Sequence, residues 1–151
     1  MLLAARAVEI VIDAKAASDD PYIAAQNALK AASSLLTSNA SFVLTTSSVE
    51  ATGADFAAIT AAIGLAAATL VRRLPIDGMI LTGGATAAAV LKALSVKSIK
   101  LSGELEPGIP IGWIEAPRRM AVITKAGGFG SINTLANAAA NLRGSYTGVP
   151  T

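Results

Sequence analysis

With 151 residues, the chain has the size of one domain that buries about 68–70% of its unfolded surface, and we expect a single domain over residues 1–151. It contains no cysteine and no histidine, which excludes disulfides, thiol chemistry, a Ser-His-Asp triad and histidine metal ligands. The 12 basic and 10 acidic residues are mixed along the chain, so the net charge of +2 does not predict nucleic-acid binding.

The chain opens with a β-branched run, Val8–Ile12, which predicts a strand. Only half a helix, Leu2–Ala7, precedes this strand, and we expect a further segment upstream. Asp20 followed by Pro21 predicts a helix start with an aspartate N-cap, and Ser38-Asn39 predicts the helix end. The inner face of this helix is predicted by apolar residues at helical spacing, namely Tyr22, Ala25, Leu29, Ala32 and Leu36.

A second strand is predicted at Phe42–Leu44, and it runs into the hydroxyl-rich segment Thr45–Ser48. That segment is either a capped polar loop or a set of hydroxyls facing a ligand at the carboxyl edge of a sheet. A long helix then begins within Thr52–Asp55 and ends at Arg72-Arg73, a pair that serves the helix dipole or is simply solvated. Its inner face is predicted to carry Phe56, Ile59, Ile63 and Leu70. The alanines, Asp55 and the terminal arginines argue against a membrane span.

The second half of the chain predicts more strands than helices. Met79–Leu81 is a buried strand, and a helix follows Gly84 with Val90, Leu91 and Leu94 inside. Val96–Leu105 alternates and predicts an edge strand whose inner side is Ile99, Leu101, Gly103 and Leu105. Two further strands, Pro110–Glu115 and Ala121–Ile123, precede a last helix with Ser131 as its N-cap and Ile132, Leu135, Ala139 and Leu142 inside.

Alternation of strands and helices in the first part predicts parallel strands with crossover helices on both faces, and the three late strands predict a mixed edge. The predicted fold is therefore an α/β domain, a Rossmann-like three-layer α/β/α sandwich with a mostly parallel sheet. Without a leader or membrane segment in the pattern, we expect a cytoplasmic protein.

Two glycine pairs follow predicted core strands, Gly83-Gly84 after the first and Gly127-Gly128 after the second. Glycine lets the backbone approach a ligand closely, and a helix N-terminus offers free N–H groups to an anion. Parallel strands would bring both turns to one edge of the sheet. Lys125 is either a point charge for a phosphate or a solvated lysine at a strand end. The pattern predicts a phosphate-bearing ligand, although it matches neither a Walker A loop nor a GxGxxG fingerprint.

Three motifs at their joint spacing, GGATA from Gly83, GELEPG from Gly103 and KAGGFG from Lys125, resemble the carboxyl-terminal nucleotide-binding domain of the four-carbon acid sugar kinases. The resemblance is strong over 77–130 and upstream of it holds in pattern only. It implies a kinase that uses ATP and Mg²⁺ to phosphorylate acids such as erythronate and threonate. It also implies an amino-terminal domain, absent here, that holds the acid sugar as partner.

The resemblance further implies which residues meet the nucleotide. Gly83, Gly84, Thr86 and Ala87 would line the phosphates, and Ala85 lies within the same turn. Gly127 and Gly128, beside Lys125, would approach the nucleotide from the second loop, while Glu104 and Gly108 would shape the pocket or bind the base and ribose.

The chain departs from the family pattern at two places. The family has an aspartate where this chain has Ala85, and that aspartate would help to hold Mg²⁺ or cap the helix. The family's domain also opens with a strand and a Gly-Ser turn that this sequence lacks. No residue is assigned as a catalytic base or as a metal ligand, so the chain alone is not expected to be a competent kinase.

Three functions remain open at this point. The first is a nucleotide-binding kinase subunit or fragment that is completed by a separate acid-sugar domain. The second is a non-catalytic domain that oligomerises through its alanine-rich helices, and the third is a small phosphosugar-binding module.

Overall fold

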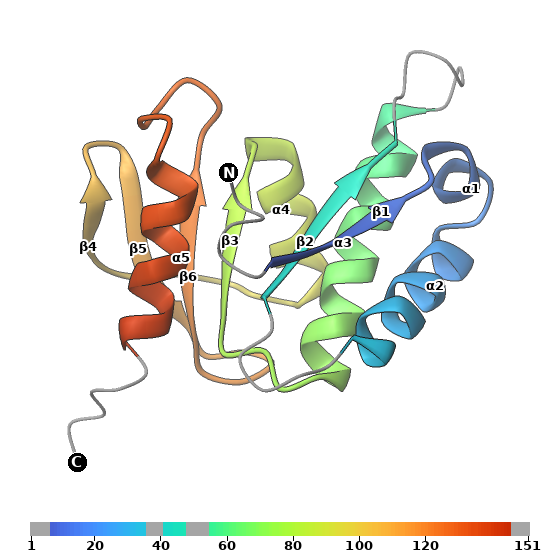
Figure 1. The fold of residues 1–151 in the computed structure, drawn as a ribbon, viewed down its shortest axis with the longest axis horizontal. Helices are drawn as coiled ribbons and strands as arrows, with labels where there is room; N and C mark the ends of the chain where they lie inside the picture. Colours follow the sequence, from blue (N-terminus) through green and yellow to red (C-terminus); the bar gives the residue numbers. More distant parts are fainter. Residues whose placement is uncertain (1–6, 36–40, 48–54, 146–151) are drawn as a thin grey trace.

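The computed structural model describes residues 7–35, 41–47 and 55–145. Within these ranges the elements are, in chain order, β1 (Ala7–Ile12), α1 (Ala14–Asp19), α2 (Pro21–Ser34), β2 (Ser41–Thr46), α3 (Phe56–Arg73), β3 (Gly78–Thr82), α4 (Gly84–Ala93), β4 (Lys100–Glu106), β5 (Ile109–Ile114), β6 (Met120–Lys125) and α5 (Thr134–Ser145) (Figure 1). Every strand predicted from the sequence is present. The half helix predicted before β1 lies outside the described residues, except that Ala7 already belongs to β1. Helix α2 ends at Ser34, with Leu35 as its C-cap, so it stops before the predicted end at Ser38-Asn39.

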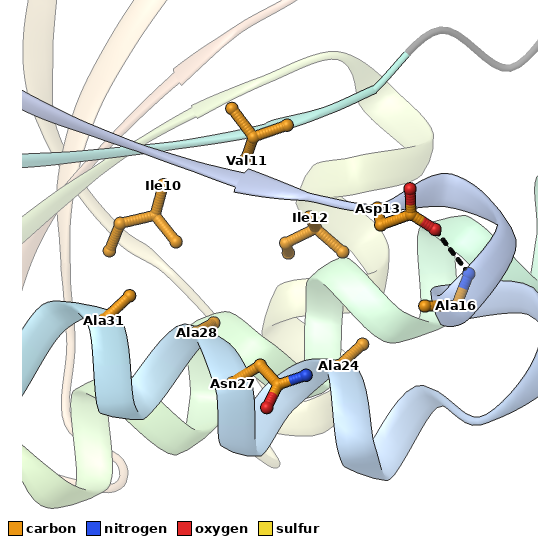
Figure 2. Close-up of a pocket in the computed structure, with 9 residues that line it drawn as sticks. All are labelled: Ile10, Val11, Ile12, Asp13, Ala16, Ala24, Asn27, Ala28 and Ala31. Carbon is orange, nitrogen blue, oxygen red and sulfur yellow. Dashed lines mark hydrogen bonds between the residues drawn. The ribbon is translucent and has the colours of Figure 1, made fainter.

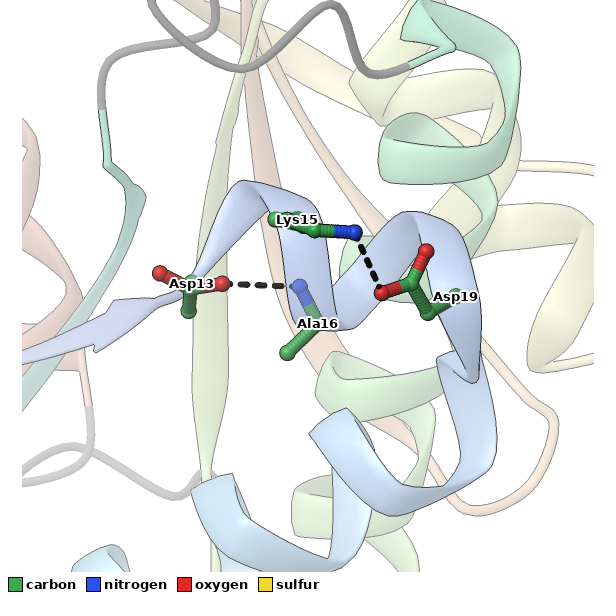
Figure 3. Close-up of polar contacts among 4 residues, drawn as sticks. All are labelled: Asp13, Lys15, Ala16 and Asp19. Atoms are coloured by element: carbon green, nitrogen blue, oxygen red, sulfur yellow. Dashed lines mark hydrogen bonds and ion pairs between the residues drawn. The ribbon is translucent and has the colours of Figure 1, made fainter.

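Helix α1 is absent from the sequence prediction. The Asp13 carboxylate accepts a hydrogen bond of 2.7 Å from the Ala16 N–H and caps the helix, and Lys15 pairs with Asp19 at 2.8 Å one turn later (Figure 3). Both ionic groups are largely exposed, so the pair contributes little to stability. Six residues are too few to show helical periodicity, and only the cap pattern signals this helix.

The two long helices begin where the sequence predicts. The Asp20 carboxylate accepts from the N–H groups of Tyr22 and Ile23, and Pro21 occupies the first turn of α2. The Asp55 carboxylate caps α3 by accepting from the Ala57 N–H at 2.9 Å. These side chains satisfy N–H groups that have no partner inside their own helix.

The strands form two sheets. In the first, β1 pairs in parallel with β2, and in the second, four strands lie in the order β3-β6-β5-β4. The β3–β6 pair is parallel, and the β6–β5 and β5–β4 pairs are antiparallel, which gives the predicted mixed edge with β4 outermost. The α/β class is therefore confirmed. In place of one mostly parallel sheet the described strands form two sheets, with two parallel and two antiparallel strand pairs.

Helices cover both faces of the four-stranded sheet. One face packs Val122 of β6 and Leu81 of β3 against Val90 of α4. The other face packs Ile123 of β6 against Ala138 of α5. Alternate residues of one strand therefore enter different cores, as expected for a strand covered on both sides, and this part of the chain has three layers.

Helix α3 packs in the cores of both sheets. Its residues Ala62, Ala66 and Leu70 pack in the core beneath β1, while Ala68 and Val71 pack in the core beneath β3. By length and composition alone α3 would pass for a membrane span, but it packs between α2 and α4 as the central helix of the fold (Figure 1).

Four large apolar residues predicted to face the interior are instead exposed, namely Tyr22, Phe56, Leu101 and Ile132, at 64%, 66%, 70% and 90%, and Gly103 of β4 is exposed as well. The three on the helical segments stand at or before the first turn of their helices. Leu101 lies on β4, which is the outermost of the described strands in its sheet. Periodicity predicts a face of a helix or strand but not where the neighbouring element ends.

Close packing of α3 against α4 depends on Gly64. A Cβ atom at this position would lie 2.8 Å from the Ala89 carbonyl oxygen and 3.2 Å from the Ala89 Cβ. We expect Gly64→Ala to destabilise the fold, because overpacking costs about 1–3 kcal/mol and exceeds the gain in helix propensity of about 1 kcal/mol. Thermal unfolding measures the effect. Gly144→Ala on α5, where the added Cβ meets open space, is the control and should leave the melting temperature unchanged or higher.

Candidate functional site

The two glycine turns lie side by side. β3 and β6 are parallel neighbours in which Thr82 pairs with Lys125, and the Gly83 N–H donates to the Lys125 carbonyl at 2.9 Å. Gly83-Gly84 and Gly127-Gly128 therefore leave the same edge of the sheet, at the top of Figure 1. This juxtaposition confirms the predicted placement of the turns.

Gly83 is the residue at which the chain changes from strand to helix. It has φ of +87°, a conformation that favours glycine, and it occupies the N-cap of α4 without a side-chain cap. The first bond of the helix runs from the Ala87 N–H to the Gly83 carbonyl. The N–H groups of Gly84, Ala85 and Thr86 precede that bond and are the donors that a helix start leaves for an anion.

Three of the glycines open onto empty space. A Cβ atom built at Gly84, Gly127 or Gly128 meets no other atom within 4 Å. Neither loop packing nor positive φ requires glycine at these positions. A side chain at any of these three positions would occupy the open space through which another molecule could reach the backbone.

Lys125 turns back on its own loop. Its ammonium group donates to the carbonyls of Ala126 at 3.3 Å and Gly127 at 3.4 Å. These two bonds help to hold the second turn and leave the lysine half-buried at the strand end. A role toward a phosphate remains a prediction.

Glu106, at the end of β4, ties the second turn in place, a role that the sequence prediction missed. Its carboxylate accepts from the Thr134 hydroxyl at 2.7 Å, the Ser131 N–H at 3.2 Å and the Asn137 amide at 3.3 Å. Thr134 is buried at the start of α5, so one carboxylate joins β4 to the segment that follows β6. These contacts cross 25 to 31 residues, and no local pattern in the sequence signals them.

The hydrogen bond from Thr134 is the main cause that lowers the pKa of Glu106 below its usual value, with smaller contributions from Ser131 and Asn137 and an opposing effect of desolvation. Because the folded pKa is depressed, the carboxylate stabilises the fold fully above the unfolded pKa of about 4.3. That contribution is lost as the pH falls through the folded pKa.

We therefore expect Glu106→Gln to lower the melting temperature at pH 7, and the difference from the wild type to shrink as the pH falls from about 5 toward 3. Thermal melts at pH 7, 5, 4 and 3 measure this dependence. Glu104→Gln, which removes an exposed carboxylate two residues earlier on the same strand, is the matched control. A difference between Glu106→Gln and the wild type that stays constant over this range would contradict the assignment.

The β4–β5 turn reaches the same edge. β4 is antiparallel to β5, and β5 is antiparallel to β6, so β4 runs parallel to β6 and ends at the same edge of the sheet, with β5 between them. Gly108 in this turn has φ of +78°, and a Cβ there would collide with the ring of Phe129 from the loop after β6. Glu104 lies before the turn on the exposed part of β4, opposite Pro110. The structure thus brings Gly108 to the glycine turns and leaves Glu104 on the strand.

The edge does not provide a magnesium site of its own. The described residues contain no group of three or more acidic or histidine side chains, and Ala85 has no oxygen donor. Mg²⁺ prefers one or two carboxylates together with phosphate oxygens, so these side chains do not fit a directly bound ion. Position 85 is also the second residue of α4, and the N-cap is Gly83, so the expectation that an aspartate at position 85 would act as the N-cap is wrong.

Two hollows in the described part of the chain lie away from this edge. One hollow of about 150 Å³ lies between β1 and α2, where Ala24, Ala28 and Ala31 face Ile10 and Ile12 (Figure 2). Another of about 230 Å³ lies beside Ser95–Ser98, after the C-terminal end of α4. Ligand pockets usually measure about 300–1,000 Å³, and both hollows are smaller. We therefore place the candidate site at the open glycine edge.

Two hydroxyl groups at the end of β2 form hydrogen bonds within the chain. The Ser47 hydroxyl accepts from the Ala14 N–H at 2.9 Å, and the Thr45 hydroxyl donates to Glu9 at 2.8 Å. These contacts support the capped-loop interpretation for the two residues, while Ser48 lies outside the described part of the chain. Arg72 likewise has a structural role, donating to the Ala93 carbonyl at the end of α4.

Residues 2–135 match the family described as a nucleotide-binding C-terminal domain. The chain belongs to this family. It is 38% identical over 93 residues to a D-threonate kinase of Bordetella bronchiseptica, covering 60% of this chain and 23% of that protein. It is 31% identical over 62 residues to a 3-oxo-tetronate kinase of Burkholderia multivorans, covering 41% and 14%.

A solved structure agrees with these matches. A domain of unknown function from Bordetella bronchiseptica, crystallised as a domain-swapped dimer with bound citrate, superposes with a TM-score of 0.83 at 29% identity, over 94% of this chain and 36% of that one. The resemblance to the carboxyl-terminal domain of the four-carbon acid sugar kinases is therefore confirmed. The chain spans about a quarter or less of the length of these two kinases.

Proposed function

We propose that this chain binds ATP through its two glycine turns and serves as the nucleotide-binding domain of a four-carbon acid sugar kinase. The observation that carries the proposal is the hydrogen-bonded juxtaposition of Gly83 and Lys125, which places two open glycine turns at one edge of the sheet in a chain of the nucleotide-binding family.

In this proposal the phosphates approach the first turn of α4, where the N–H groups of Gly84, Ala85 and Thr86 point out of the helix and Ala87 closes the first bond. Gly127 and Gly128 bring the second backbone segment to the same phosphates. Magnesium would arrive with the nucleotide, held by phosphate oxygens and water. Glu104 and Gly108 then border the part of the edge that receives the base and ribose.

Phosphoryl transfer also needs a group that positions the attacking hydroxyl. The Glu106 carboxylate is already engaged by three hydrogen bonds that hold the segment after the second turn. We therefore propose that residues 1–151 act as one nucleotide-binding domain, and that a separate acid-sugar-binding domain or subunit supplies the acceptor and the remaining catalytic groups. Threonate- and erythronate-type acids are the proposed substrates, and the cytoplasm is the proposed location.

Isothermal titration of the chain with ADP, with and without Mg²⁺, tests nucleotide binding directly. We expect saturable heat and a rise in melting temperature. An absence of both at millimolar ADP would overturn the proposal. Sugar phosphates serve as the competing class, and stronger binding of a sugar phosphate than of ADP would favour a phosphosugar-binding module instead.

A second candidate function is a non-catalytic assembly domain. Two observations favour it, namely Ala85 in place of an aspartate and the domain-swapped dimer formed by the similar protein of Bordetella bronchiseptica. Sedimentation equilibrium separates the two candidates. A chain that remains monomeric and binds ADP supports the kinase domain, and a stable oligomer without ADP affinity supports the assembly domain.

A further inference from the structure

Phe129 presents an aromatic ring to solvent at the edge that carries the glycine turns. The residue is 54% exposed, although it stands in the loop that directly follows Gly127 and Gly128. One side of its ring covers the backbone of Gly108, where a Cβ atom would lie 2.9 Å from the ring carbon Cε1. A single exposed apolar residue is common on protein surfaces, but the Phe129 ring lies against Gly108 at the edge that carries the two glycine turns.

Hydrogen bonds hold the backbone of the loop on both sides of Phe129. The Phe129 N–H donates to the Ala126 carbonyl at 3.2 Å and closes a turn just before the ring. Two residues later the Ser131 N–H donates to Glu106. Gly130 between them has φ of +89°, and a Cβ there would lie 3.1 Å from the Thr134 Cβ. Because the backbone is held and one side of the ring already lies against Gly108, stacking another flat group on the ring costs little further conformational freedom.

The order of the strands gives the direction of the ligand. The strands lie side by side in the order β3-β6-β5-β4. The turn into α4 follows β3, and the Gly127-Gly128 turn follows the next strand, β6. Phe129 contacts Gly108 in the β4–β5 turn, on the side of β6 away from β3. Neighbouring strands lie about 4.8 Å apart, so the carboxyl end of β3 and the start of β5 are separated by roughly 10 Å. A phosphate chain at the first two turns would therefore leave the rest of the nucleotide over Phe129.

We infer that the exposed face of Phe129, backed by Gly108, is the platform on which the purine base of the nucleotide stacks. This inference rests on the proposed nucleotide-binding function and adds to it the position and chemistry of the base. Stacking on an aromatic ring strengthens nucleotide binding by about 5- to 150-fold, and it requires a π-face rather than apolar volume alone.

The test compares ADP with inorganic pyrophosphate, which lacks a base, by isothermal titration of the whole chain. We expect Phe129→Ala to weaken ADP binding at least fivefold and to leave pyrophosphate binding unchanged. Phe129→Tyr should bind ADP like the wild type, and Phe129→Leu, which keeps apolar cover over Gly108, should bind it as weakly as Phe129→Ala. Leu101→Ala, which removes an exposed apolar side chain at the other end of β4, is the control and should change neither affinity.

Full ADP affinity in Phe129→Leu would overturn the inference, because cover of Gly108 would then be sufficient. An equal loss of ADP and pyrophosphate in Phe129→Ala would also overturn it, since the ring would then only shape the phosphate loop. Wild-type chain that binds no ADP would instead overturn the proposed function itself. Melting curves of each variant show that the fold is retained.

Discussion

Replacing Gly84 or Gly127 by valine is expected to weaken ADP binding by about 30- to 1,000-fold while leaving the fold intact. The branched side chain would occupy the space through which the phosphates reach the backbone. A hydrogen bond to a charged oxygen contributes about 1.5–3 kcal/mol, so losing one or two of them accounts for the roughly 2–4 kcal/mol to which this range corresponds. Isothermal titration with ADP measures the loss.

The structure makes this test informative because a Cβ at either glycine meets no atom within 4 Å, and neither has the positive φ that favours glycine. A folding defect is therefore not expected, and valine suits the first turn of a helix at least as well as glycine does. Gly103→Val, another glycine with open space but located on β4, is the matched control and should keep full affinity. Unchanged ADP affinity in both variants would show that the turns serve packing alone.

The second large effect is expected from Ala85→Asp, which should make nucleotide binding depend on magnesium. An aspartate at the second position of α4 places a carboxylate beside the phosphates. With Mg²⁺ present the carboxylate can share the ion, and we expect ADP to bind about tenfold more tightly than to the wild type. With EDTA the same carboxylate repels the phosphates, and we expect binding about tenfold weaker than the wild type.

The difference in ADP affinity of Ala85→Asp between Mg²⁺ and EDTA distinguishes a metal-binding role of the carboxylate from stabilisation of the helix. An acidic residue in the first turn also stabilises the helix by about 0.3–1 kcal/mol, and that gain does not depend on Mg²⁺. Ala85→Asn, which has a similar shape without the charge, is the control. Equal ADP affinity of Ala85→Asp with Mg²⁺ and with EDTA would remove the metal argument.

Local chemistry explains why much of the fold could be predicted. The β-branched strand of β1, the aspartate caps at Asp20 and Asp55 and the two glycine pairs are set by near neighbours in the chain, and each stands where the sequence predicts. Helical periodicity failed at Tyr22 and Phe56 because burial depends on where the covering element ends. Helix α1 was missed because six residues carry too little pattern.

The sequence by itself determined the α/β class, the strand–glycine–helix units and the nucleotide-binding family, since these follow from short-range preferences and motif spacing. Only the tertiary structure decided which groups meet at the edge. The Gly83–Lys125 hydrogen bond, the Glu106 contacts with Ser131 and Thr134, and the seat of the Phe129 ring on Gly108 join residues 21 to 42 positions apart. Such contacts depend on strand order and register, which the whole packed sheet fixes and no single segment encodes.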